Sequence, residues 1–288
     1  MKPLKIIFSR QCLEYDSPGH PESSERVRKV YEFLKMFKYF KFLEPKPCSR
    51  QDLLMVHSNT LVDTIKHGDF EDSETPNIPN IYYYARLSAG GAVLAMKTAL
   101  NEGRAFSLMR PPGHHASQNK FEGFCYFNNI AIAVTKALTT VKKIAILDID
   151  AHHGQGTQEI FMGDPHVIYV SLHQYGFIYP GTGRHSEKNA YNFPLPAGTD
   201  EKEYIEKLLV GIDKIREFDP DLIAVSAGFD TYEGDPLTSL NLKVKTYEKI
   251  GKIIAELDKP RFAVLEGGYS IEKIPLCVYE FLKGFNNS

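Results

Sequence analysis

The chain has 288 residues, of which 43% are hydrophobic and 24% charged, and its formal net charge is −2. This composition is typical of a globular protein with a buried core, and it lacks the basic excess of a nucleic-acid binder. The apolar runs are too short to cross a membrane, and MKPLKIIFSR is too soon polar for a secretory signal. The four cysteines form no CxxC pair, so we expect a cytoplasmic protein with reduced thiols.

Short β-branched runs alternate with amphipathic segments along the whole chain. The runs predict strands at 4–8, 105–109, 144–149, 167–172, 222–227 and 262–266. The amphipathic segments predict helices near 24–38, 82–101, 127–139, 201–218, 243–257 and 272–284, the fourth capped by Thr199 or Asp200. Strands separated by helices indicate a mostly parallel sheet covered on both faces. We therefore expect a single α/β domain over residues 1–288.

Polar or glycine-rich segments follow five of the predicted strands. They span 110–124, 150–157, 173–190, 228–241 and 267–271. In parallel α/β sheets the ligand crevice lies beyond the carboxyl ends of the strands. We therefore expect these five loops to meet at one edge of the sheet.

The strand 144–149 runs into the sequence DIDAHHG, which is unusual at the end of a buried strand. Side chains alternate along an extended chain, so Asp148, Asp150 and His152 are predicted to point to one side. Aspartate and histidine at this spacing suit a zinc ion, although a hydrogen-bonded cluster is an equal alternative. Asp230 follows another strand, and two aspartates with one histidine would leave the open position of a catalytic zinc.

Three further motifs carry groups suited to catalysis. His114 and His115 follow a rigid Pro-Pro-Gly turn and are suited to proton transfer, with surface histidines as the alternative. Gly123 and Phe124 could line a narrow channel or could serve packing alone. Tyr269 follows two glycines and can donate its phenolic proton, unless the segment is an ordinary turn.

Taken together, these motifs resemble the histone deacetylase family, which includes acetylpolyamine amidohydrolases and acetoin-utilisation proteins. The resemblance runs in order through His20-Pro21, Arg26, RPPGHHA, GFCYFNN, LDIDAHHGQGT, VSLH, YPGTG, GFDTYEGDP and LEGGY. It implies an arginase-like α/β fold with an eight-stranded, mostly parallel sheet. The LEGGY form, with Glu266, is similar to class II members.

The resemblance also implies roles for individual residues. The ligands of one Zn²⁺ per chain, or alternatively Fe²⁺, would be Asp150, His152 and Asp230. The catalytic group would be His114, His115, Tyr269 and Asp148. The acyl-lysine tunnel would be formed by Gly123, Phe124, Tyr179, Gly268 and Leu237, with Arg26 in an internal acetate-release region. A structural K⁺ would lie by Asp148, Asp150, His152, Ser171 and Leu172.

The resemblance predicts hydrolysis of N-acyl-lysine amides by a metal-activated water, with His115 as general base and His114 held by Asp148. Gln155 stands where many relatives have Asp or Asn, which should leave His115 less basic. Leu237 replaces a glutamate found in polyamine-selective relatives and favours acyl-lysine in proteins or peptides. The acidic segment 69–74 could attract cationic substrates or could be an ordinary solvated loop.

Other functions fit parts of the same pattern. An acetylpolyamine amidohydrolase, or another deacylase of small amines, would use the same machinery. An arginase-type ureohydrolase would bind two manganese ions, but the residue two positions after Asp230 is Tyr232 rather than an acid. A catalytically silent acyl-lysine binding protein is the alternative from a different class. No long inserted loop suggests a dimer, so a monomer is expected.

Overall fold

The computed structural model describes residues 3–287 and shows one sheet of eight strands in that part of the chain. The strands are β1 (Leu4–Ile7), β2 (Phe40–Leu43), β3 (Arg104–Ser107), β4 (Ile144–Asp148), β5 (Val167–Gln174), β6 (Ala190–Leu195), β7 (Leu222–Ala227) and β8 (Arg261–Leu265). Their order in the sheet is β2-β1-β3-β8-β7-β4-β5-β6. Every pair is parallel, which confirms the predicted α/β sheet and makes it fully rather than mostly parallel.

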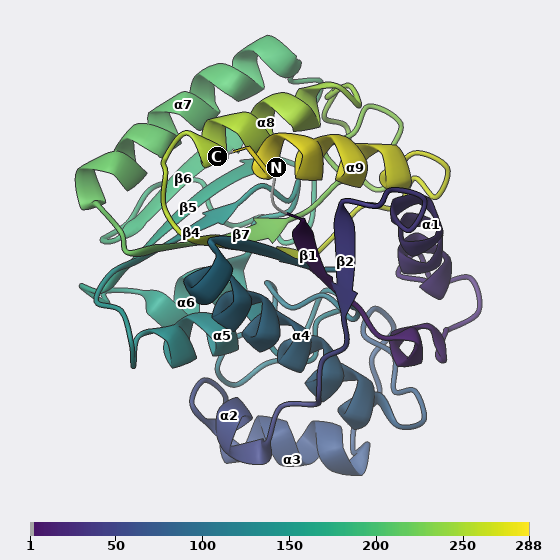
Figure 1. Ribbon diagram of the computed structural model, residues 1–288. Coiled ribbons are helices and arrows are strands. Elements are labelled where there is room, and N and C mark those ends of the chain that lie inside the picture. Colours follow the sequence, from purple (N-terminus) through teal and green to yellow (C-terminus); the bar gives the residue numbers. More distant parts are fainter. Residues whose placement is uncertain (1–2, 288) are drawn as a thin grey trace.

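Helices cover both faces of this sheet (Figure 1). One face carries α1 (Ser24–Leu34), α7 (Glu201–Phe218), α8 (Thr246–Ala255) and α9 (Ile274–Phe285). The other carries α4 (Ile81–Glu102), α5 (Asn129–Ala137) and α6 (Gln155–Phe161), with α2 (Arg50–Leu54) and α3 (Asn59–His67) beyond them. A short 3-10 helix spans Arg10–Leu13. Each face therefore has its own hydrophobic core.

Most predicted elements are present with small shifts at their ends. Asp200 is the N-cap of α7, and its side chain accepts a hydrogen bond from the Glu203 N–H. Five elements were not predicted from the sequence, namely β2, β6, α2, α3 and α6. Residues 150–157 were expected to form a loop, whereas α6 begins at Gln155.

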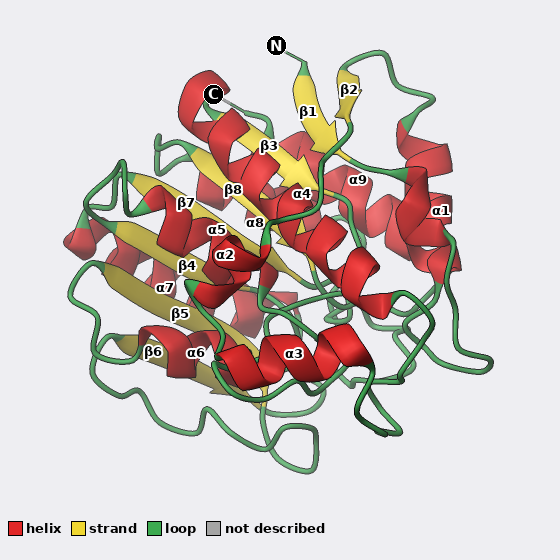
Figure 2. Ribbon diagram, turned by 90° about the horizontal axis from the view of Figure 1, so that it is seen from below, coloured by secondary structure: helices red, strands yellow, loops and turns green. Residues whose placement is uncertain are grey.

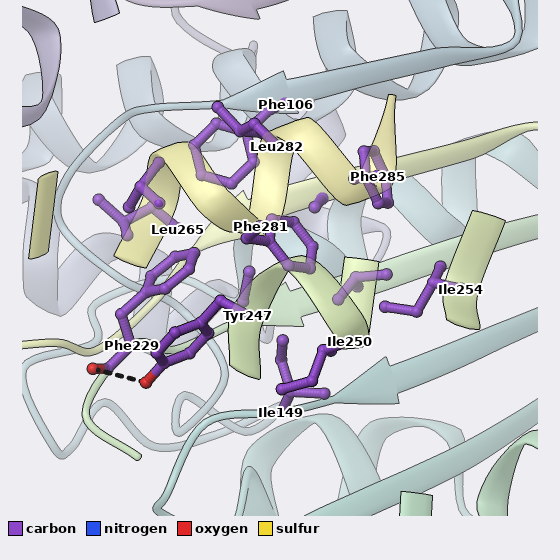
Figure 3. Packing of buried hydrophobic residues seen from close by; sticks show 14 of the residues in the cluster. Phe106, Ile149, Phe229, Tyr247, Ile250, Ile254, Leu265, Phe281, Leu282 and Phe285 are labelled. Carbon is purple, nitrogen blue, oxygen red and sulfur yellow. Dashed lines mark hydrogen bonds between the residues drawn. The ribbon is translucent and has the colours of Figure 1, made fainter. Parts of the chain in front are cut away.

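The core between the sheet and helices α8 and α9 supports one loop at the sheet edge directly (Figure 3). The ring of Phe229 lies 5.4 Å from that of Tyr247 and 5.8 Å from that of Phe281, measured between centroids. The Tyr247 hydroxyl donates to the Phe229 carbonyl at 3.2 Å. Phe229 precedes Asp230, so the core fixes the backbone that carries this candidate ligand.

The long loops gather at the carboxyl ends of the strands, the side toward which the strand arrows point in Figure 2. β4 and β7 are neighbours in the sheet, with Asp148 opposite Ser226. The loops that follow these strands therefore start side by side, as predicted. Within the described residues, no helix combines the length and apolar character needed to span a membrane.

Candidate active site

The predicted metal ligands meet at the carboxyl edge of the sheet. Asp150, His152 and Asp230 are buried, and each offers one ligand atom within 4.8 Å of the others. The His152 Nδ1 lies 2.8 Å from Asp230 Oδ2 and 3.2 Å from Asp150 Oδ1. Burial and the Asp150 carboxylate raise the pKa of Asp230 to about 7. A divalent cation among these donors would relieve that repulsion, so the site fits a metal of the zinc type.

Backbone groups orient the two carboxylates. The Gly267 N–H donates to Asp150 Oδ2 at 2.7 Å, and the Ala151 N–H donates to Asp230 Oδ1 at 2.8 Å. These bonds leave Asp150 Oδ1 and Asp230 Oδ2 facing His152. Gly267 has no room for a side chain, because a Cβ there would lie 2.5 Å from Asp230 Oδ2. Such outer contacts hold metal ligands in their binding orientation.

Asp148 supports His114 rather than joining the metal-ligand group. Strand β4 ends at Asp148, so the predicted alternation does not continue to His152; instead the His152 N–H donates to Asp150 Oδ1. The His114 Nδ1–H and the Tyr169 hydroxyl donate to Asp148 Oδ2 at 3.0 and 2.9 Å. Burial alone would lower the pKa of His114, but Asp148 and Asp150 raise it to about 10. The two carboxylates therefore favour the protonated form of His114.

His115 has a different environment from its neighbour. Its Nδ1 lies 2.7 Å from Gln155 Oε1, and Gln155 Nε2 donates to the Tyr179 hydroxyl at 3.2 Å. With the amide in this orientation, His115 donates through Nδ1–H and keeps its lone pair on Nε2. Burial and the charge on His114 hold the pKa of His115 well below its usual value. Gln155 thus contacts His115 through a neutral amide oxygen.

Tyr269 and Glu266 come from the loop that begins at the end of β8. The Arg26 guanidinium lies 4.7 Å from the centre of the Tyr269 ring and donates to the carbonyls of Glu266 and Gly268. Glu266 Oε2 accepts hydrogen bonds from the N–H groups of Gly113 and His114. Glu266 therefore ties this loop to the turn that carries the two histidines, a role that the sequence did not indicate.

A pocket of ≈ 330 Å³ opens above these groups. Its floor and walls contain His115, His152 and Tyr269 together with four of the predicted channel residues, and the full lining is Glu74, His115, Gly123, Phe124, His152, Phe177, Ile178, Tyr179, Leu237 and Tyr269. Phe177 is fully exposed at the rim. Glu74, from the acidic segment, is the one charged carboxylate among the described residues of the lining.

Some predicted site residues lie outside this pocket lining. Gly268 is not part of this lining, and its carbonyl accepts a hydrogen bond from Arg26. Ser171 is opposite Asp148 in the sheet, and its hydroxyl pairs with His173 Nδ1 at 2.8 Å. Leu172 is buried. The K⁺ site expected by Asp148, Asp150, His152, Ser171 and Leu172 stays a prediction. Phe177 and Ile178 were not predicted, because isolated apolar residues in a loop carry no signal of their own.

Comparison with known proteins places this geometry in a family. A model of the histone deacetylase domain matches residues 20–285. The chain belongs to the histone deacetylase family. This confirms the resemblance inferred from the motifs, and it makes the chain a hydrolase of a family that acts on amides.

Other histone deacetylase family members match nearly the whole chain. A probable deacetylase of Methanothermobacter thermautotrophicus is 38% identical over an alignment of 300 residues, covering 98% of this chain and 91% of that protein. Histone deacetylase clr3 of Schizosaccharomyces pombe is 35% identical, covering 94% of this chain and 45% of that protein. The crystal structure of acetylpolyamine aminohydrolase from Burkholderia pseudomallei has a TM-score of 0.91 at 26% identity, with 98% of each chain covered.

Proposed function

We propose that this chain is a zinc-dependent deacylase that hydrolyses N-acyl-lysine amides in proteins or peptides. The observation that carries the proposal is the position of Asp150, His152 and Asp230, since His152 of this trio lines the same pocket as His115 and Tyr269. Two carboxylates and one imidazole leave a coordination position open, which is the pattern of a catalytic metal site. When bound, zinc polarises the amide carbonyl and lowers the pKa of a water molecule.

The protein groups then divide the remaining work. His115 Nε2 takes the proton of the attacking water and later delivers it to the leaving amine nitrogen. The hydroxyl of Tyr269 donates a hydrogen bond to the oxygen on which negative charge develops. His114, fixed by Asp148, stays charged beside His115 and disfavours protonation of His115 before the reaction begins.

The pocket favours a substrate whose amine-bearing chain is slender and largely apolar. Phe124, Tyr179 and Leu237 form its walls, and position 237 carries no carboxylate, so Glu74 is the one carboxylate of the described lining that a second ammonium group could meet. A lysine side chain offers four methylenes to such a channel and leaves the peptide backbone outside. This supports acyl-lysine over acetylated polyamines, which remain the alternative because relatives with both kinds of name match the chain.

The test is a panel of acyl-lysine peptides and acetylpolyamines, with metal content measured on the same samples. We expect one metal ion per chain, and hydrolysis that releases the carboxylic acid and leaves a free lysine amine. Tyr269→Phe should lower kcat by about 10²- to 10³-fold, the usual cost of removing one such donor. Tyr191→Phe, which removes a hydroxyl on edge strand β6, serves as the matched control and should leave kcat unchanged.

Two outcomes would overturn the proposal. Two tightly bound metal ions per chain would indicate a binuclear site of the arginase type. If the wild type, Tyr269→Phe and His115→Ala were equally inert across the panel yet bound acyl-lysine peptides, the chain would be a binding protein.

A further inference from the structure

The carboxylate of Asp235 joins two loops of the pocket. Its Oδ2 accepts hydrogen bonds from the backbone N–H groups of Tyr269 at 2.6 Å and Ser270 at 3.2 Å. Its Oδ1 accepts from the N–H of Leu237 at 3.0 Å. The residue is buried, with 7% of its surface exposed. One side chain therefore binds three backbone groups, two beside the proposed oxyanion donor and one in the channel wall.

Tyr269 needs such an anchor because of the residues before it. It follows Gly267 and Gly268, and Gly268 has a φ of +116°, a conformation that restricts glycine little. The glycines themselves are required, since a Cβ at Gly267 would meet the metal-ligand carboxylates and one at Gly268 would lie 2.9 Å from Phe229 Cβ. The backbone that packs closely against the metal site therefore cannot hold Tyr269 by its own stiffness.

Arg26 and Phe124 contact the ring, and Arg26 also donates to the Gly268 carbonyl, in the peptide unit before Tyr269. The Arg26 guanidinium lies against the ring face, and the Phe124 ring meets it edge-on with 5.9 Å between centroids. Both contacts would allow the ring to slide in its plane. The two hydrogen bonds to Asp235 fix the peptide groups on either side of the Tyr269 Cα, which sets where the hydroxyl ends.

We propose that Asp235 is a positioning residue that places Tyr269 against the substrate carbonyl and couples it to the channel wall at Leu237. The inference rests on the proposed deacylase function. Its role differs from that of Asp150 or Asp230, because its carboxylate accepts hydrogen bonds from three backbone N–H groups. Loss of the anchor should affect the step in which Tyr269 stabilises charge more than the binding of substrate. A displacement of about 1 Å can cost as much as ~10²-fold in rate.

Asp235→Asn tests this with little change in shape. An amide has one oxygen, so in either orientation an N–H of Leu237 or of Tyr269 and Ser270 faces an NH₂ group. We expect kcat to fall by about 10- to 100-fold, with KM within about 3-fold. In the Tyr269→Phe background the same change should alter kcat/KM by less than about 3-fold, since the hydroxyl that Asp235 positions is gone.

Asp221→Asn is the matched control. Asp221 Oδ2 also accepts from two consecutive backbone N–H groups, those of Lys142 and Lys143, at 2.8 and 3.0 Å. Asp221 and the two lysines lie at the amino ends of β7 and β4, whereas the pocket lies beyond the carboxyl ends of the strands. The control variant should keep wild-type kcat, and metal content and melting temperature are measured for every variant. If Asp235→Asn does not fold, Asp235→Glu, which keeps both acceptor oxygens one methylene further out, enters the same cycle.

The outcomes separate the two proposals. Equal loss of kcat/KM from Asp235→Asn in the wild-type and Tyr269→Phe backgrounds would overturn the positioning role, as would a wild-type kcat in Asp235→Asn. A wild-type enzyme that is inert on the whole panel would instead overturn the deacylase function.

Discussion

Glu22 holds two buried arginines beneath the Tyr269 loop, and its removal should destabilise the protein measurably. Its Oε1 accepts from Arg26 at 3.0 Å and Arg110 at 2.8 Å, and its Oε2 accepts from Arg110 at 2.7 Å. The relative exposures of Arg26, Arg110 and Glu22 are 0%, 1% and 5%. Although burial opposes ionisation of Glu22, the Arg110 guanidinium holds its pKa below the usual value. The substitution Glu22→Gln would remove the carboxylate that pairs with Arg26, and it would leave Arg110 paired with the half-exposed Asp16 at 3.5 Å.

The size of the effect follows from what the arginines would keep. Breaking a buried ion pair by removing one partner costs about 3–5 kcal/mol. Arg110 would retain the carbonyls of Cys12 and Tyr15, and Arg26 those of Gly268 and Glu266, so we expect the lower end, about 3 kcal/mol. An unfolding entropy of roughly 2.1 cal/mol/K per residue gives ~0.6 kcal/mol/K for this chain. The melting temperature should therefore fall by about 5 °C.

Differential scanning calorimetry at pH 7 measures this, with Glu25→Gln as control. Glu25 pairs with Arg28 on the same helix at 2.7 Å, but both side chains are nearly half exposed. An exposed pair contributes little, so the control should melt within about 1 °C of the wild type. The Glu22 pKa is lower in the folded state, so its contribution is present above the unfolded pKa of about 4.3 and is lost as pH falls through the folded value. Equal melting temperatures for the two variants at pH 7 would refute the reasoning.

Three further changes probe the metal site and the core behind it. Chelation should lower the melting temperature, and added Zn²⁺ should restore it. The free energy of unfolding should rise by about 4 kcal/mol when free metal is ~1,000-fold above its Kd, whereas Asp230→Asn should respond to neither treatment. Gly267→Ala would place a Cβ 2.5 and 2.6 Å from the Asp230 and Asp150 carboxylates. The metal content, measured by atomic emission, should therefore fall below one ion per chain. A full metal content would contradict the close packing described for this loop. Phe281→Ala removes a fully buried ring that contacts Phe229, and urea unfolding should show a loss of about 3–5 kcal/mol; a loss below ~1 kcal/mol would mean that the cavity collapses.

The central strands could be predicted from sequence because burial on both faces leaves an unbroken apolar run. β4 and β7 are such runs, and every residue in them is buried. β2 and β6 were missed because they form the two edges of the sheet, where burial is incomplete. Proline lacks the N–H that an inner ladder needs, and Pro194 within β6 is tolerated only because that strand is an edge.

The candidate site was predictable in its residue types but not in its detailed contacts. The parallel topology already required the motif loops to meet, and the structure places the predicted metal trio together. Asp148 was expected on the same side as His152, but β4 ends there and the next residues turn. Whether Gln155 reaches His115 depends on where α6 begins, and a glycine-rich segment gives no sign of a helix start.

The order of the strands has a consequence for how the molecule is assembled. β7 and β8 come last in the chain, yet they lie between β3 and β4 in the sheet. Until they are in place, the N-terminal strands and the β4–β6 group have no ladder connecting them, and each exposes an unpaired inner edge. Asp230 and Tyr269 arrive on the loops of this inserted pair. A chain in which β7 and β8 are not yet paired with their neighbours therefore has neither the third candidate ligand nor the tyrosine in place at the candidate active site.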